Sequence, residues 1–155
     1  MSDAVTSQTK VVFVANPNNP TGTYSSKEAV EKFLDALPPT ALVVLDEAYF
    51  EYVTNADYPD GVTLLSRHPN LIVVRTFSKA YGLAGLRVGY GVASKEIAEV
   101  LNRVRHPFNV NALALAAAEA ALGDDTFLAE SIQQNLKGLN QLGLGLDKLG
   151  LDWIP

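Results

Sequence analysis

The sequence predicts an α/β fold, with a mainly parallel sheet and covering helices. Three apolar runs, at residues 10–15, 41–45 and 71–74, have the length and composition of buried strands. Stretches in which apolar residues recur with helical spacing lie between and after them and would cover the sheet. A chain of 155 residues with 48% hydrophobic composition is long enough for one domain with its own core.

Composition and charge exclude several classes of protein. A formal net charge of −5 without a basic cluster argues against nucleic acid as a partner. No apolar run approaches the length of a membrane span, and residues 1–7 lack the pattern of a signal peptide. There is no cysteine, which excludes disulfides, and the histidines His68 and His106 do not form a pair at metal-ligand spacing. We expect a cytoplasmic protein without a metal site.

The first apolar run, at residues 10–15, predicts a strand buried on both faces. It leads into residues 16–22, where two prolines and a glycine forbid regular structure and fix the direction of the loop. This loop has two interpretations. It is either a plain strand-to-helix turn, or a site at which Asn19, held just before Pro20, presents its amide to a bound ligand.

A covering helix is predicted next. The sequence Ser25-x-x-Glu28 has the form of a capping box, and apolar residues then recur on one helical face as far as Leu37. The prolines at 38 and 39 stop this helix. We assign no chemistry to it.

The second apolar run, at residues 41–45, ends in Asp46-Glu47-Ala48-Tyr49. Aliphatic strands that end in acidic residues also occur in nucleotide hydrolases, but this sequence lacks the phosphate loop that such proteins need. A dinucleotide-binding turn is missing as well, because Ser94 stands where the third glycine is required. The other polar residues near this strand are predicted to be surface or packing residues: Glu47, Glu51 and Tyr52.

A turn-rich segment at residues 55–61 separates the second strand from the third. Leu64 and Leu65 are expected on a short helix that closes at His68-Pro69, with His68 in solvent. The third apolar run, at residues 71–74, then leads into the stretch on which the functional prediction depends.

That stretch, residues 75–89, places polar side chains in a glycine-spaced loop after a buried strand. Its candidate functional residues are Thr76, Ser78, Lys79 and Arg87. A lysine fixed at the end of a buried strand differs from a solvated surface lysine, because its amine is held in place for Schiff-base chemistry. A fourth strand, at residues 87–93, follows and is weakened by its glycines.

Three helices are predicted in the last third of the chain. The first spans residues 94–104, and the second spans residues 112–122 between an Asn111 cap and Gly123. Because the second is apolar nearly all round, it should be buried inside the molecule or at a subunit interface. The third begins at Asp124-Asp125, and its glycines favour a helix connecting two domains over a coiled coil.

Three motifs therefore occur in order, each after an apolar strand: Asn16-Pro17-Asn18-Asn19-Pro20-Thr21-Gly22, Asp46-Glu47-Ala48-Tyr49, and the stretch around Lys79. With these motifs the chain resembles the middle of a fold-type I aminotransferase that uses pyridoxal phosphate (PLP). Within that family it is most similar to the histidinol-phosphate aminotransferases. The resemblance implies a partial PLP-binding large domain at residues 1–123 and, at residues 124–155, a long connecting helix that leads toward an absent small domain.

The resemblance also assigns roles residue by residue. Lys79 would bond the cofactor covalently and move the substrate proton, while Asp46 would pair with the ring nitrogen. The implied cofactor-binding set is Asn19, Asp46, Tyr49, Thr76, Ser78, Lys79 and Arg87. In this set Asn19 and Tyr49 would hydrogen-bond the phenolic oxygen, and Thr76, Ser78 and Arg87 would hold the phosphate. In some family members an arginine near the position of Arg105 reaches a substrate's acidic group, but the local match is loose, and a structural or surface role is the favoured one.

The implied activity is amino transfer between an amino acid or amine, with L-histidinol phosphate favoured, and 2-oxoglutarate, as a step of histidine biosynthesis. A homodimer acting on small molecules is expected for the full-length protein. Because the resemblance covers less than half of a family member, the alternative is an inactive truncated module that packs against a partner or binds PLP weakly. We expect the chain alone not to be turnover-competent. A transcription regulator with an aminotransferase-like domain would need a DNA-binding region that this sequence does not contain.

Overall fold

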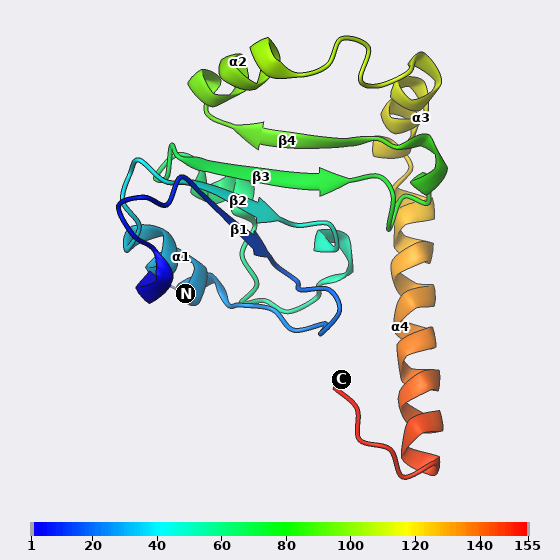
Figure 1. Ribbon diagram of the computed structural model, residues 1–155. Coiled ribbons are helices and arrows are strands. Elements are labelled where there is room, and N and C mark those ends of the chain that lie inside the picture. The colour runs from blue at the N-terminus through cyan, green and yellow to red at the C-terminus, as the bar shows by residue number, and fades with distance from the viewer. Residues whose placement is uncertain (1, 155) are drawn as a thin grey trace.

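The computed structural model describes residues 2–154 and contains an α/β fold built on one four-stranded sheet (Figure 1). The strands, in spatial as well as chain order, are β1 (Val11–Ala15), β2 (Leu42–Asp46), β3 (Leu71–Thr76) and β4 (Gly89–Ala93). The first three pair in parallel, whereas β4 runs antiparallel to β3. The predicted fold class, with its mainly parallel sheet, is confirmed.

Four α-helices accompany the sheet in the described chain: α1 (Lys27–Asp35), α2 (Lys95–Val104), α3 (Ala112–Leu122) and α4 (Asp125–Lys148). The predicted Asn111 cap of α3 is confirmed, because Asn111 Oδ1 accepts from Ala114 N. Helix α2 also has a side-chain cap, in which Ser94 Oγ accepts from Ile97 N. The start of α1 was predicted one residue too early. Ser26 is its N-cap.

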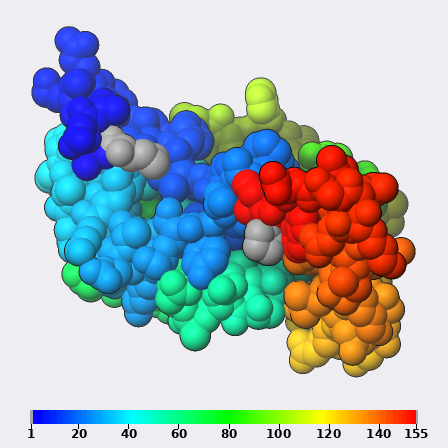
Figure 2. Space-filling view, turned by 90° about the horizontal axis from the view of Figure 1, so that it is seen from below, coloured from blue at the N-terminus to red at the C-terminus, as the bar shows by residue number. Residues whose placement is uncertain are grey.

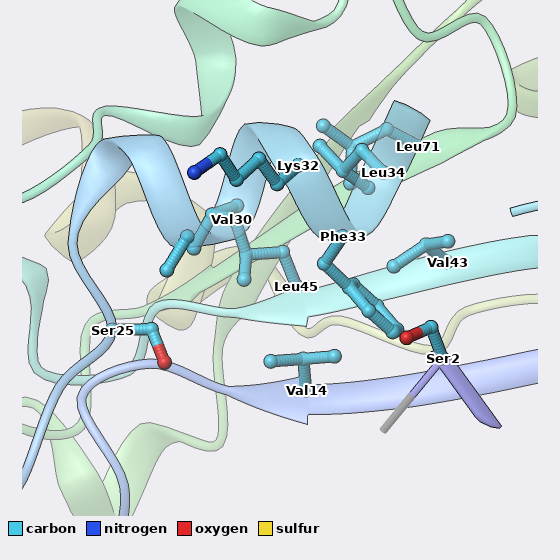
Figure 3. A pocket seen from close by; sticks show the side chains of 11 residues that line it. Ser2, Val14, Ser25, Val30, Lys32, Phe33, Leu34, Val43, Leu45 and Leu71 are labelled. Atoms are coloured by element: carbon cyan, nitrogen blue, oxygen red, sulfur yellow. The ribbon is translucent and has the colours of Figure 1, made fainter. Parts of the chain in front are cut away.

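Helix α1 covers one face of the sheet and forms the main core with it. Val30 and Leu34 of α1 pack against the alternate residues of β2 and β3 that point toward them, namely Val43, Leu45, Leu71 and Val73. A hollow of about 380 Å³ remains between this helix and the sheet (Figure 3). Its lining is mostly apolar, and Lys32 at its margin pairs with Glu28 at 2.7 Å. We assign no ligand to this hollow.

The opposite face of the sheet is open along β1. Successive strand residues point to opposite faces, so Val11, Phe13 and Ala15 lie on the side away from α1. The Phe13 side chain is 72% exposed. The prediction that the first strand is buried on both faces is therefore wrong for the described residues, because β1 is an edge strand covered on one side alone.

Helix α3 is also covered on one side. Its Ala114 and Ala118 join Phe77 and Val88 in a second, smaller core cluster. Its leucines at 113, 115 and 122 are exposed, so burial of this helix inside the molecule is wrong for these side chains. A subunit interface on that face stays a prediction.

The segment between β2 and β3 corrects the prediction for His68. The short helix is the 3-10 helix Gly61–Leu64, and His68 N donates to the carbonyl of Leu64. His68 is buried, 7% exposed, with its Nε2 3.8 Å from Asp35 Oδ1 at the end of α1. Contact with α1 removes it from solvent, and sequence spacing does not indicate that contact.

Helix α4 stands at one side of the molecule, where it forms a ridge of orange and red beside the blue and cyan body (Figure 2). The residues after it turn back, and Trp153 Nε1 donates to Asp147 Oδ1 at 2.9 Å. The indole packs on Gly143, where an added Cβ would lie 2.6 Å from Trp153 Cη2. Among the described residues, no helix combines the length and the apolar character needed to cross a membrane.

The packing of Trp153 on Gly143 can be tested by Gly143→Ala. The new methyl group has no room, so we expect the indole to leave the helix and the fluorescence emission of this single tryptophan to move to longer wavelength. Gly145→Ala is the matched control, because a Cβ there meets nothing within 4 Å. The control should keep the emission unchanged and stabilise α4 by about 1 kcal/mol. Identical emission spectra of the two variants would contradict this packing.

Candidate functional site

The carboxyl ends of the parallel strands meet at one edge of the sheet. Beyond the ladder, Asn16 N donates to the Asp46 carbonyl at 2.9 Å, and Glu47 N donates to the Val74 carbonyl at 2.9 Å. The loop after β1, the end of β2 and the turn after β3 are therefore neighbours. In open α/β sheets ligands bind at this edge.

A cavity of about 590 Å³ opens beside this edge. Asn19, Tyr49 and Lys79 line it from the sheet side, and Asn135, Leu136 and Leu139 of α4 line it from the other. Asn19 Nδ2 donates to Tyr49 Oη at 2.7 Å, and Lys79 Nζ lies 5.2 Å from the centroid of the Tyr49 ring. The amide, phenol and amine thus form one group at the cavity wall.

A second hollow, of about 340 Å³, lies next to the first. Its polar lining comes from the ends of β2 and β3 and from the turns that follow: Asp46, Arg75, Thr76, Ser78, Lys79 and Arg87. Lys79 lines both hollows. The structure therefore brings all seven predicted site residues to the same edge of the sheet.

Buried hydrogen bonds fix the base of the loop that carries Asn19. The Asn16 side chain is 1% exposed, accepts from Ser25 N at 2.7 Å and donates to the Ser25 carbonyl at 3.2 Å. The Tyr58 hydroxyl donates to the Asn16 carbonyl. Both Asn-Pro bonds of this loop are cis. Asn19 itself is exposed at the tip, where its amide faces the cavity wall.

The backbone around Lys79 is held by its buried neighbours. Phe77 and Ala80 are buried on either side, and Thr76 Oγ1 accepts from Ser78 N at 3.1 Å. Gly82 N closes the turn on the Lys79 carbonyl at 2.9 Å, with Gly82 at a φ of 70° that favours glycine. The Lys79 side chain remains exposed, so the chain fixes its backbone and leaves its amine accessible.

Arg87 and Asp46 complete the smaller hollow. Arg87 adopts a left-handed φ of 55°, which delays the start of β4 to Gly89, and its Nη1 donates to the Ala84 carbonyl at 2.9 Å. The Asp46 carboxylate accepts from Ala48 N at 3.1 Å. One oxygen of this carboxylate is therefore held by a hydrogen bond from the turn that directly follows Asp46.

Glu47 and Arg75 form a buried ion pair behind the site, and sequence reasoning assigned neither a role there. Arg75 Nε and Nη2 donate to Glu47 Oε2 at 2.9 and 2.7 Å, and Gly61 N donates to Oε1 at 2.8 Å. Burial raises the pKa of Glu47, and the bonds from Arg75 and Gly61 oppose that rise. Of the two positions predicted for Glu47, surface or packing, the structure shows the packing one. The charged Arg75 directly after the apolar run of β3 was the signal that could have indicated its partner.

Glu51 is a partly buried carboxylate whose pKa also responds to the charge of Arg75. Its Oε2 is buried and has no hydrogen-bond partner among the described residues. Burial raises the pKa of this group, and only weaker contributions, its own backbone N–H and the charge of Arg75, lower it. Glu51 is therefore a packing residue that carries an electrostatic cost.

Comparison with known proteins identifies the family. The aminotransferase class I and II family matches residues 1–155. The chain belongs to this family. The histidinol-phosphate aminotransferase 2 of Pseudomonas aeruginosa is 61% identical over the whole chain, which spans 42% of that protein. The chain thus has about two fifths of the length of the curated relatives it matches.

Solved structures agree with this family and its fold. The histidinol-phosphate aminotransferase of Sinorhizobium meliloti, in complex with pyridoxal-5'-phosphate, matches 94% of this chain and 39% of its own with a TM-score of 0.88 and 39% identity. The L-threonine-O-3-phosphate decarboxylase of Porphyromonas gingivalis matches 98% of this chain and 45% of its own, with a TM-score of 0.81 and 29% identity. Since one fold accommodates both reactions, the fold alone does not select the reaction.

The cost of burying Glu51 predicts an unusual pH dependence of stability. Its folded pKa is raised, so the native state holds this proton more tightly, and the free energy of unfolding falls as pH rises through that pKa. Glu51→Gln has no titrating carboxyl group and therefore removes this fall in the free energy of unfolding. We expect the variant to gain stability over the wild type as pH rises from 4 toward 7, measured by urea unfolding.

Glu28→Gln is the control of opposite sign. The hydrogen bond from Lys32 lowers the pKa of Glu28, so its contribution to stability is present at neutral pH and is lost on acidification. This variant should be slightly less stable than the wild type at pH 7 and equal to it at low pH. If Glu51→Gln followed the same course as Glu28→Gln, the burial cost assigned to Glu51 would be wrong.

Proposed function

We propose that this chain is the PLP-binding segment of an aminotransferase that exchanges an amino group between L-histidinol phosphate and 2-oxoglutarate. The observation that carries the proposal is the position of Lys79, which lines both hollows at the sheet edge. On one side it adjoins the pair of Asn19 and Tyr49, and on the other it adjoins Asp46 and the polar turn after β3. The name of the 61% identical relative supports this choice of amino donor.

The residues present have the chemistry that PLP requires. When bound, PLP supplies an electron sink that stabilises negative charge at the α-carbon of the substrate. Lys79 provides a primary amine that can bond the cofactor's aldehyde carbon and, once released, hold the α-proton as a general base. Its fixed backbone and exposed amine suit both tasks.

Asp46, Tyr49 and Asn19 would orient the ring. A carboxylate at Asp46 favours a protonated ring nitrogen, since an opposite charge nearby stabilises the charged form. The Tyr49 hydroxyl and the Asn19 amide already lie within hydrogen-bond distance of each other, at 2.7 Å. They offer two preorganised donors to a phenolic oxygen, which lowers the cost of ordering them on binding.

Thr76, Ser78 and Arg87 would hold the phosphate. The Thr76 oxygen accepts from Ser78 N, which leaves its hydroxyl proton free to donate to an anion. Arg87 adds a planar, permanently charged guanidinium, which matches phosphate oxygens with two parallel hydrogen bonds. These three residues share the smaller hollow with Lys79.

The remaining features of the proposal concern the full-length protein. We infer a homodimer in the cytoplasm, with residues 1–123 in the large domain and residues 124–155 as the connecting helix. The Arg105 guanidinium donates to Asn102 Oδ1 at 3.0 Å and to Asn109 Oδ1 at 3.2 Å, which supports a structural role for it. Since the chain spans 42% of its relatives, a module that binds PLP without turnover is the second candidate.

Lys79→Ala tests the central residue. After incubation with PLP and reduction by borohydride, we expect the wild-type chain to carry a stable adduct on Lys79, located by peptide mass spectrometry. Lys79→Ala should lose it, because among residues 2–154 no other amine lines both hollows. Lys95→Ala, which removes an exposed lysine from α2, is the control and should keep the adduct. Retention of the adduct in Lys79→Ala would refute the assignment.

A chimera separates the two candidate functions. In it, this chain replaces the matching 42% of the Pseudomonas aeruginosa relative, and transamination of L-histidinol phosphate with 2-oxoglutarate is measured beside the chain alone. We expect turnover in the chimera and a loss of at least about 10³-fold in the chain alone, because substrate orientation supplies much of the rate. An inactive chimera that still binds PLP would favour the non-enzymatic module.

A further inference from the structure

A cluster built around the buried Glu47 carboxylate lies next to the candidate site. Its members are Glu47, Phe50, Asp60 and Arg75. Three of them are chain neighbours of candidate site residues, in the pairs Asp46 with Glu47, Tyr49 with Phe50, and Thr76 with Arg75. A change in the cluster therefore acts on the same backbone segments that carry the site.

The geometry of strands places the two groups on opposite faces. Adjacent residues at the end of a strand point to opposite sides of the sheet. Asp46 and Thr76 lie on one side, facing the smaller hollow, whereas the Glu47 carboxylate lies beside the core residues Leu45 and Val73 at Gly61. Arg75 bonds this carboxylate and also lines the smaller hollow. The cluster joins β2 to β3 at the level of the site, with the Glu47 carboxylate on the side away from the smaller hollow.

The cluster is tightly bonded. The Glu47 side chain is fully buried and that of Arg75 is 12% exposed. Besides its two bonds to Glu47, the Arg75 guanidinium donates to Asp60 Oδ1 at 2.6 Å, and its central carbon lies 3.5 Å from the centroid of the Phe50 ring. Gly61 leaves no room beside it, since a Cβ there would lie 2.7 Å from Glu47 Oε1. Three hydrogen bonds and the close approach of Gly61 therefore hold the carboxylate in place.

The net stability gained from such an arrangement is small. Taking two charges out of water costs about as much as their attraction returns, and apolar residues of similar volume often stabilise a fold equally well. What this pair does provide is a fixed distance and orientation between the two segments that carry it, because two guanidinium N–H groups donate to one carboxylate oxygen while Gly61 N holds the other. The ion pair therefore contributes more to the relative position of the two strand ends than to the stability of the fold.

We propose that Glu47 is a positioning residue for the candidate site and acts through Arg75 and Asp46, an inference that rests on the proposed function. The ion pair holds the end of β2 against the end of β3. The Asp46 carboxylate and the turn bearing Thr76 and Lys79 thereby keep a constant separation. The rigid ring of PLP would require this, since Asp46 and that turn would hold different parts of it.

The test compares PLP binding by Glu47→Gln and wild-type chains through the visible absorption of the Lys79 adduct. Glu47→Gln keeps the side-chain length and an oxygen for Gly61 N but loses the charge that holds Arg75. We expect its Kd for PLP to rise about tenfold, by analogy with the lower range found when outer-shell partners of metal ligands are removed. Glu28→Gln, which breaks an exposed ion pair on α1, is the matched control and should not change Kd.

A double-mutant cycle separates positioning from general loosening of the fold. If Glu47 acts through Asp46, Glu47→Gln should cost almost nothing further in an Asp46→Asn background. If it only loosens the fold, its effect should be the same fold-change in both backgrounds. All variants are compared at a temperature where circular dichroism shows each of them folded, and Arg75→Lys, which keeps the charge but not the fork, replaces Glu47→Gln if that variant does not fold.

The outcomes distinguish this inference from the proposed function. A wild-type chain that forms no adduct on Lys79 overturns the proposed function and the positioning role together. An adduct on Lys79 whose Kd is unchanged by Glu47→Gln, or is changed equally with and without Asp46, overturns the positioning role alone. A tenfold loss that vanishes in the Asp46→Asn background supports it.

Discussion

Parallel pairing of the first three strands is the constraint on which the rest of this structure depends. The register aligns Ala15 with Asp46 and Asp46 with Val74, so the loops that follow β1, β2 and β3 leave the sheet at the same level. Had β2 or β3 run in the opposite direction, its polar end would lie at the far edge. Motifs that are about thirty residues apart in the sequence become neighbours because of strand direction alone.

The same edge shows how charge is distributed between two faces of a sheet. On the ligand side, Asp46 and Lys79 remain accessible, and their groups are free to meet a bound molecule. On the core side, Glu47 forms an ion pair with Arg75, and its second carboxylate oxygen accepts a hydrogen bond from Gly61 N. Alternation along the strands separates a reactive set from a supporting set although their residues are adjacent in the chain.

Much of the fold could be predicted because local chemistry determines it. Apolar runs indicated the strands, and the Asn111 cap indicated the start of α3, since an Asn oxygen needs only its own helix to find a partner. The exposure of β1, the burial of His68 and the burial of Glu47 could not be predicted in this way. Each depends on whether a distant element covers the residue, and periodicity does not contain that information.

By itself, then, the sequence determined which groups the protein has for chemistry and the order in which strands present them, because residue type and spacing are local properties. Tertiary structure alone decided that Lys79 lines two adjoining hollows, that α4 supplies the far wall of one of them, and that Glu47 meets Arg75 behind the site. The physical reason is that burial and contact arise between elements. They exist only once the strands have paired and the helices have packed against them.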